Sequence, residues 1–442
     1  MFWLQLAILL ALILIGAQLK GLGMGIMGAL GTLIFVYGFQ MPIGDAPIEV
    51  MLIILCVITA AASLQMAGGM DYLVFLAEKI IRKNPSLITF IGPLVTFLFT
   101  LLAGTSHICY SLLPIIAEVS AKTGIRPEKP LSISVIASSF GIIACPISAA
   151  TVAMLSELNS IPNNTYGLFD IIAIVLPACL IGLLAGSVVA SLRGINLDVD
   201  LAFQEKMKNP AYKALIMGKP FNPNQSFSKE SKLSVLVFLL GVVGVMLLGV
   251  FYPLHRDFFE KQLHINMEQN IQLIMLSVVL INVLFAKVKT AEITNSSIFK
   301  SGIEAVISIF GVVWMSNTFI KANEFNLISG LHNAVSQNSG VFAIALFFMS
   351  ALLFSQASTV KSMMPLGIKL GLLPASLIWM YPATAGLFFI PSYPTSIAAI
   401  NFDKTGTTKV GKFLINHSFM IPGLVSTFIT LLVAYLLSQI IL

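Results

Sequence analysis

"AGTSH", residues 103–107, interrupts an apolar stretch that runs from 87 to 121. A stretch of about 35 residues is too long for one membrane span, which needs roughly 20. The small and polar residues in its middle predict two half-length helices that meet at a polar tip. We therefore expect a re-entrant hairpin, which enters and leaves the membrane on the same side.

A second stretch of this kind runs from 338 to 372 and is interrupted by "SQAST", residues 355–359. When the two interruptions are aligned, Pro114 falls on Pro365. Further on, Pro130 pairs with Pro374, and after one inserted residue Pro146 pairs with Pro391. The chain therefore looks like two related halves, and the hairpins are expected to open to opposite sides of the membrane.

Composition places the chain in a membrane. Of its 442 residues, 57% are hydrophobic and 10% are charged, and the mean hydropathy is +0.95. Soluble domains carry about 25% charged residues, so this chain is expected to be an all-α integral membrane protein. The remaining apolar segments are 2–18, 22–40, 48–65, 131–155, 169–191, 233–254, 270–286, 301–320, 374–402 and 413–441.

Basic residues predict the orientation. With the N-terminus outside and both long stretches drawn as hairpins, 20 of the 25 Lys and Arg residues fall in cytoplasmic connections and 3 in outer ones. A hairpin that crossed the membrane fully would move the later connections to the other side and blur this asymmetry. Both termini are thus expected in the periplasm. The net charge of +6 orients the chain and does not indicate nucleic-acid binding.

The domain organisation follows from the repeat. Each half should contain three helices, a hairpin, a Pro-broken helix and a closing helix, with the second half inverted. Inverted repeats with discontinuous helices are typical of secondary transporters. The expected parts are the first repeat 1–193 (hairpin about 87–121, broken helix about 131–155), a basic cytoplasmic linker 194–231, and the second repeat 232–442 (hairpin about 338–372, broken helix about 374–402).

The first hairpin tip contains Gly104, Thr105, Ser106 and His107. Hydroxyls and free N–H groups at the start of the second half-helix could hold one carboxylate. Ordinary N-capping by Ser or Thr is the alternative. His107 could carry a proton during transport or be a hydrogen-bonded structural residue.

The second tip offers Ser355, Gln356, Ser358 and Thr359, and Lys361 follows in the same half-helix. An ionisable residue inside a membrane is costly and indicates a functional site. A second substrate carboxylate would be the natural partner of Lys361. The alternative is a side chain that reaches the outer surface.

Two broken helices are predicted at "GIIACPIS" (141–148) and "GLFFIPSYPT" (386–395). Proline removes a backbone donor and leaves a carbonyl unpaired, and unwound backbone at membrane depth can bind substrate. A plain proline kink with serine back-bonding is the alternative. The break residues are Gly141, Pro146, Gly386 and Pro391, flanked by the candidate ligands Ser148, Ser392 and Thr395.

The string DKTGT at 403–407 matches the phosphorylation motif of P-type pumps, but the context excludes ATP chemistry. Asp403 stands in a connection of about ten residues, and no nucleotide-binding pattern occurs in the chain. A phosphorylated Asp needs a nucleotide domain and a Mg²⁺ site. We expect a cytoplasmic turn with local side-chain caps.

An intramembrane hydrolase that uses Ser106 and His107 is another class of function. Neighbouring helical residues point about 100° apart, so these two cannot readily form a nucleophile–base pair. Neither a G-x-S-x-G nor an H-E-x-x-H pattern is present. We expect no enzyme activity, no metal site and no cofactor.

Several motifs resemble the anaerobic four-carbon dicarboxylate transporter (Dcu) family, closest to its DcuA branch. The resemblance runs nearly end to end. It is carried by "LQMAGGMDYLVFLAEKIIRKNP" (64–85), "LAGTSHICYSLLPIIAEV" (102–119), "IIACPISAATVAM" (142–154), "SALLFSQASTVKSMMPL" (350–366) and "FIPSYPTSIAAINFDKTGTTKVGKFLINHSF" (389–419).

The resemblance implies exchange, uptake and efflux of fumarate, succinate, malate and aspartate across the bacterial inner membrane, in support of fumarate respiration. It also implies the fold of the wider ion-transporter superfamily, whose members are often dimers with elevator-like motion. The family carries D-x-T-G-T-T in this loop without hydrolysing ATP.

We hypothesise an exchanger that holds a dianion between the two tips and the two breaks. Thr105 and Ser106 would bind one carboxylate, and Ser355, Ser358 and Lys361 the other. Exchange would follow if the empty carrier cannot reorient with its basic and dipolar groups uncompensated. The alternative is a sodium- or proton-coupled symporter of another organic anion.

Overall fold

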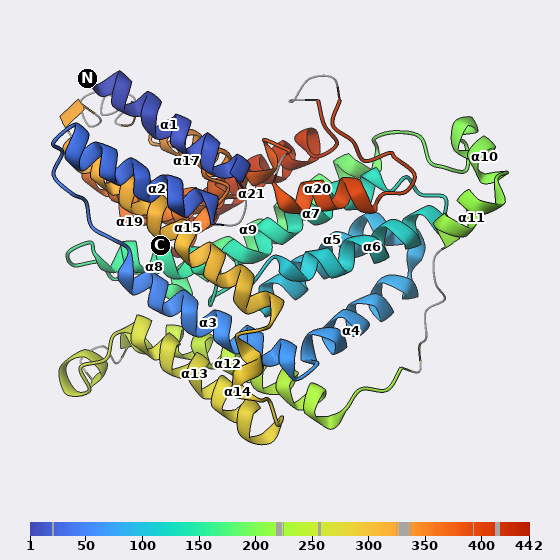
Figure 1. The fold of residues 1–442 in the computed structure, drawn as a ribbon, viewed down its shortest axis with the longest axis horizontal. Coiled ribbons are helices and arrows are strands. Elements are labelled where there is room, and N and C mark those ends of the chain that lie inside the picture. The colour runs from blue at the N-terminus through green and yellow to red at the C-terminus, as the bar shows by residue number, and fades with distance from the viewer. Residues whose placement is uncertain are drawn as a thin grey trace.

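Helices make up the computed structural model of the chain (Figure 1). It describes residues 1–19, 22–217, 223, 225–254, 258–323, 325–326, 335, 337–391, 393–411 and 416–442. In the first half the elements are α1 (Phe2–Leu19), α2 (Gly23–Leu33), the π-helix η1 (Ile34–Gly38), α3 (Ile48–Met66), α4 (Gly69–Lys83), the 3₁₀ turn η2 (Pro85–Leu87), α5 (Ile88–Ala103), α6 (His107–Lys122), α7 (Glu128–Ile143), α8 (Ala149–Asn159) and α9 (Leu168–Ser191).

Two short helices, α10 (Leu201–Met207) and α11 (Pro210–Met217), occupy the linker. The elements of the second half are α12 (Lys229–Leu254), the π-helix η3 (Phe258–Gln262), α13 (Met267–Phe285), α14 (Thr290–Ile293), α15 (Ser297–Ala322), α17 (Gly340–Leu353), α18 (Gln356–Lys369), α19 (Pro374–Met380), the 3₁₀ helix η4 (Tyr381–Phe388), α20 (Pro394–Phe402) and α21 (Met420–Ile441).

Six helices among the described residues are long and apolar enough to cross a membrane, or seven if one bent pair counts as a single span. The bent pair is α3 and α4, which meet at an angle of 76°. Gly68 allows the bend with a φ of +75°. Helix α4 was not expected from the sequence, because its charged residues interrupt the apolar run. Its buried face, which includes Met70, Leu73 and Ala77, nevertheless packs into the core.

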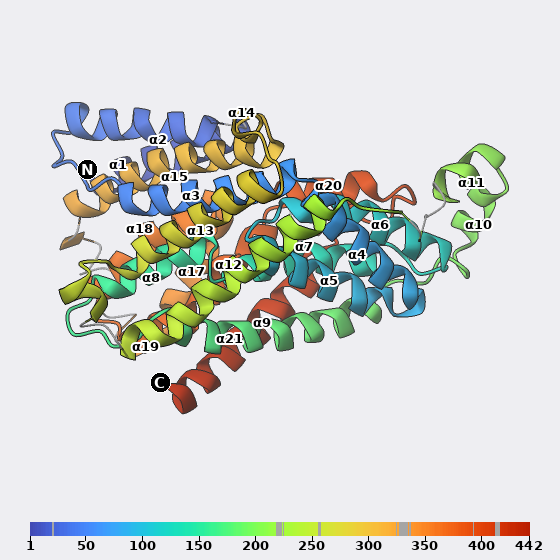
Figure 2. The same cartoon turned by 90° about the horizontal axis from the view of Figure 1, so that it is seen from below.

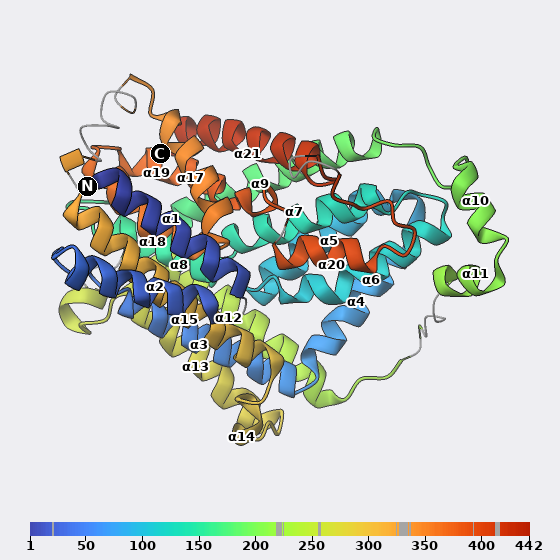
Figure 3. The same cartoon turned by 45° about the horizontal axis from the view of Figure 1, so that its top comes forward.

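Each of the two long interrupted stretches folds as two helices, of 16 residues each in the first stretch and 14 residues each in the second. The segment Pro85–Ala103, which contains α5, is one of the six helices long enough to cross a membrane. The arms α5 and α6 pack against each other, and so do α17 and α18. The first pair lies in the half of the molecule that faces α10 and α11, whereas the second pair lies in the half that holds both chain termini (Figures 1, 2 and 3). The two termini therefore lie at one end of the long axis, and the linker helices lie at the other.

Glycine allows the closest helix contacts. A Cβ atom on Gly311 of α15 would lie 2.0 Å from the backbone oxygen of Gly25 in α2, and one on Gly28 would lie 2.2 Å from the backbone of Gly311. Helices in membranes often associate through small residues that let backbones approach. The contact of α2 with α15 is of this kind, so these positions tolerate no larger side chain.

Candidate functional site

The first hairpin turns at Gly104, between α5 and α6. Gly104 has a φ of +67°, a left-handed conformation that glycine adopts without steric cost. A Cβ atom there would lie 3.2 Å from the side chain of Ile147, in the first helix break. Glycine therefore serves both the turn and the close approach of the tip to this break.

Ser106 links the first tip to the second helix break. It stands at the N-cap position of α6, but its side chain makes no capping hydrogen bond. It instead hydrogen-bonds to the side chain of Tyr393. Ordinary capping, the alternative drawn from the sequence, therefore does not describe Ser106. Thr105 is half-buried beside it, and the side chain of His107 lies outside the described part of the structure.

The second tip is capped by its own serine. Ser355 Oγ accepts a hydrogen bond of 3.1 Å from Ser358 N, and Thr359 Oγ1 donates to Ser355 O at 2.7 Å. Gln356 Nε2 donates to Ser139 O in α7 at 3.0 Å. The second tip is thus fixed both to its own half-helix and to the helix that precedes the first break.

Phe354 ends α17 in a left-handed conformation, with a φ of +49°. This conformation is uncommon for a bulky residue and marks local strain. The ring of Phe354 stacks on that of Tyr393, with centroids 6.4 Å apart and planes 4° from parallel. The strained turn at Phe354 therefore lies where the second tip contacts the second break.

We expect Phe354→Gly to be more stable than Phe354→Ala by about 1 kcal/mol, because only alanine strains the left-handed turn. Thermal unfolding of both variants in detergent measures the difference. The control pair is Leu353→Gly and Leu353→Ala, at a helical position where alanine should be the more stable. If the alanine variant were more stable than the glycine variant at both positions, the backbone at Phe354 would not be strained.

The first break separates α7 from α8. Ser148 caps α8 by accepting a hydrogen bond from Thr151 N at 3.1 Å. Thr151 Oγ1 donates to Ile143 O at 3.1 Å and lies 3.2 Å from the hydroxyl of Tyr381. The carbonyl at the end of α7 is therefore satisfied inside the protein, next to an element of the second half.

Gly141 does not start this break, as the sequence had suggested, because it lies within α7. A Cβ atom on Gly141 would lie 2.8 Å from the Thr100 side chain, so this glycine allows α5 to pack closely on α7. The unwound segment begins after Ile143 and contains Pro146. Gly386 likewise lies in the 3₁₀ helix η4, where a Cβ atom would meet Phe347 O at 2.6 Å.

The second break lies between η4 and α20 and contains Pro391. Ser392 lies outside the described residues. Thr395 and Ser396, in the first turn of α20, are buried, and the described residues offer no hydrogen-bond partner to their hydroxyls. His417 Nε2 donates to Phe389 O at 3.2 Å. Burial lowers the pKa of His417, and the hydrogen bond to Phe389 O offsets part of this effect.

Four half-helices begin where the two tips and the two breaks meet. These are α6, α8, α18 and α20, and the contacts just described join each tip to the breaks. The first N–H groups of a helix have no intrahelical partner, and the helix dipole places partial positive charge there. Four helix N-termini close together form a site suited to an anion with more than one charged group.

Lys361 neither reaches solvent nor stands alone. Its Nζ atom lies 2.6 Å from Glu157 Oε1 and 3.0 Å from Ser156 Oγ, and the Lys361 and Glu157 side chains are only 13% and 10% exposed. A lysine that extends to the outer surface, the alternative from the sequence, does not fit this burial. Glu157 was missed, although an acidic residue at the end of an apolar segment is an expected partner for an intramembrane lysine.

Other polar residues of this region were also missed. Ser396 had a signal, since it directly follows Thr395 at the start of a half-helix. Thr151 and Tyr381 had none, because each lies in an otherwise apolar segment and gains its partner only through folding.

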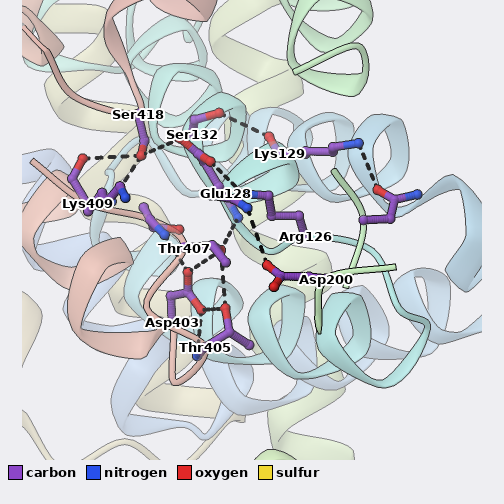
Figure 4. A network of polar contacts seen from close by, with 12 residues as sticks. Arg126, Glu128, Lys129, Ser132, Asp200, Asp403, Thr405, Thr407, Lys409 and Ser418 are labelled. Atoms are coloured by element: carbon purple, nitrogen blue, oxygen red, sulfur yellow. Dashed lines mark hydrogen bonds and ion pairs between the residues drawn. The ribbon is translucent and has the colours of Figure 1, made fainter. Parts of the chain in front are cut away.

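The Asp403 loop forms the expected turn (Figure 4). The Asp403 carboxylate accepts hydrogen bonds from Thr405 N at 2.9 Å, Thr407 Oγ1 at 2.7 Å and Thr408 N at 2.6 Å. Thr407 Oγ1 in turn accepts from Glu128 N at 3.2 Å, at the start of α7. Asp403 is only 5% exposed. Its role there is structural.

The whole chain, residues 1–442, matches the family model described as "Anaerobic c4-dicarboxylate membrane transporter". It is 38% identical over 440 residues to the C4-dicarboxylate transporter DcuA of Wolinella succinogenes, with 99% of each chain covered. It is 38% identical to the DcuA of Escherichia coli over 420 residues (95% of each chain) and 35% identical to the anaerobic C4-dicarboxylate transporter DcuB of Shigella flexneri over 428 residues (96% of each).

These matches extend over every element described above, including both hairpins and both helix breaks. The family model matches the full length of the chain, and the relatives named above are more than 30% identical to it. The chain is a multi-pass membrane protein and belongs to the family of anaerobic C4-dicarboxylate membrane transporters.

Proposed function

We propose that this protein transports four-carbon dicarboxylates, with fumarate, succinate, malate and aspartate as substrates, mainly by exchange and also by uptake. The observation that carries the proposal is the meeting of four half-helix N-termini at two hairpin tips and two helix breaks. The printed names of the relatives support the same class of substrate. No ATP is needed, because exchange of two similar anions moves each down its own gradient.

The substrate site of the proposal uses both tips. Thr105, Ser106 and neighbouring N–H groups hold one carboxylate, and Ser355, Ser358 and Lys361 hold the other. Charge-assisted hydrogen bonds of this kind are stronger than neutral ones. Further candidate ligands at the tips and breaks are His107, Ser148, Gln356, Thr359, Ser392 and Thr395, to which the unpaired hydroxyl of Ser396 is added.

The proposed mechanism is an elevator-like motion of the hairpin-bearing parts in a homodimer, with inverted repeats at 1–193 and 232–442. Its support is the position of the two hairpins in opposite halves of the molecule (Figure 3). We place the protein in the bacterial inner membrane with both termini in the periplasm. The basic linker 194–231, at the end away from the termini, agrees with the positive-inside rule.

Counterflow tests the proposal. Proteoliposomes are loaded with succinate, and labelled fumarate is added outside without sodium. Uptake that is much faster into succinate-loaded than into empty vesicles supports exchange. Equal uptake into empty and loaded vesicles would replace exchange by a coupled symporter. Absence of fumarate, succinate, malate and aspartate transport under either condition would overturn the substrate class.

Ser106→Ala is expected to weaken the apparent affinity for fumarate about tenfold, because one hydrogen bond to a charged group contributes about 1.5 kcal/mol or more. The measurement is the concentration dependence of counterflow. Ser187→Ala is the control, since Ser187 is a buried serine whose hydroxyl donates to Leu183 O in its own helix, α9. Equal affinities in both variants would remove Ser106 from the site.

A further inference from the structure

Glu157 and Lys361 form a buried ion pair between two half-helices. The two charged atoms are 2.6 Å apart, and Ser156 adds a second acceptor for the lysine at 3.0 Å. Breaking such a pair by removing one partner leaves an uncompensated charge in a low-dielectric interior, which is strongly unfavourable. The charge on Lys361 must therefore be balanced by some carboxylate whenever the lysine stays buried.

The pair belongs to the same part of the molecule as the proposed substrate site. Glu157 lies on α8 and Lys361 on α18, and these half-helices pack side by side. Both begin at a serine N-cap, Ser148 and Ser355, next to the tips and breaks. Helical side chains lean towards the N-terminus of their helix. Lys361 follows its N-cap serine by six residues, whereas Glu157 follows its own by nine and lies near the end of α8.

A substrate carboxylate and the side chain of Glu157 offer Lys361 the same chemical group. Only one of them is needed to balance the ammonium charge. A dianion that approaches Lys361 also meets repulsion from Glu157, so the two carboxylates compete. This competition matters for exchange. A carrier that returns empty must move the buried ammonium group of Lys361, and that movement is easier when a counter-ion balances its charge.

We infer that Glu157 is the protein's own counter-ion for Lys361. The Glu157 carboxylate balances the charge of the lysine when no substrate carboxylate does so, and this allows the empty carrier to reorient. The inference rests on the proposed function and deepens it. It replaces the hypothesis from the sequence that exchange arises from uncompensated basic groups in the empty carrier. Exchange then reflects a faster return of the loaded carrier, and net uptake remains open through the Glu157–Lys361 pair.

The key variant is Glu157→Gln, compared with the wild type in two assays on the same proteoliposomes. Uptake of labelled fumarate into empty vesicles requires return of the empty carrier, whereas counterflow into succinate-loaded vesicles does not. In the variant the empty carrier holds an unbalanced ammonium group, and we expect uptake into empty vesicles to fall by roughly tenfold or more. Counterflow should persist, with a lower KM because the competing carboxylate is gone.

Two further variants test whether charge is the cause. Glu157→Asp keeps the carboxylate and should retain part of the net uptake. The double variant Glu157→Gln/Lys361→Gln has no charge to balance, so the ratio of net uptake to counterflow should return towards that of the wild type, although the KM for substrate rises. Glu268→Gln is the matched control: this carboxylate is also buried, but its partner is the neutral amide of Asn159 at 2.8 Å.

The outcomes separate this inference from the function on which it rests. If the wild type shows no dicarboxylate transport in either assay, the proposed function itself fails. If the wild type transports but Glu157→Gln lowers net uptake and counterflow equally, or changes neither, Glu157 is only a structural partner and the inference is overturned. A ratio in the double variant that stays as low as in Glu157→Gln would equally overturn it.

Discussion

Lys361→Met should lower the stability of the protein by about 3–5 kcal/mol, the range observed when one partner of a buried ion pair is removed. Methionine fills a similar volume but leaves the Glu157 carboxylate without its cation, 10% exposed and inside the protein. The measurement is thermal unfolding of the purified variant in detergent. The KM for substrate should rise as well, since the variant also removes a proposed substrate contact.

The control is Lys369→Met, which makes the same substitution at an exposed position near the end of the same helix. Adding Glu157→Gln to Lys361→Met removes the stranded charge and should recover most of the lost stability, so the two sites should be strongly non-additive in a double-mutant cycle. Equal effects of the two lysine variants, or additive effects within the pair, would mean that the ion pair contributes little.

Gly311→Val is expected to destabilise the protein by about 3 kcal/mol or more, at the upper end of overpacking effects. The added Cβ atom would meet the backbone oxygen of Gly25 at 2.0 Å. Backbone cannot move aside as a flexible side chain can, so α15 and α2 must separate. Thermal unfolding and the yield of folded protein in the membrane measure the effect.

Gly244→Ala serves as the control, because the nearest atom to its added Cβ, on Ile274, is 4.0 Å away. Alanine in a helix interior is favoured over glycine by up to about 1 kcal/mol, so this variant should be neutral or slightly stabilised. A Gly311→Val protein as stable as the wild type would show that α2 does not lie as close to α15 as the structure has it.

Local chemistry explains why the sequence predicted the hairpins and breaks. Small and polar residues such as Gly104 and Ser106, or Pro146 and Pro391, act on their own backbone, so their effect can be read without the rest of the chain. The same holds for the Asp403 turn, whose hydrogen bonds span only five residues.

Other features have no local signal. Phe354 adopts a left-handed conformation that its residue type disfavours, and its ring stacks on Tyr393 from a segment distant in sequence. Helix α4 was missed because its charges hide an apolar face that only packing reveals. Gly141 was assigned to a break, whereas its use is the contact with α5, which depends on where α5 lies.

The sequence by itself determined the membrane class, the interruption of the two long apolar stretches, the two helix breaks and the family resemblance, because hydropathy, proline and glycine act within a few residues. Only the tertiary structure decided which groups meet. It joined Ser106 to Tyr393, Gln356 to Ser139 and Lys361 to Glu157. The partners of buried polar groups are set by packing between distant helices, since a charge removed from water must find its counter-ion wherever the fold brings one.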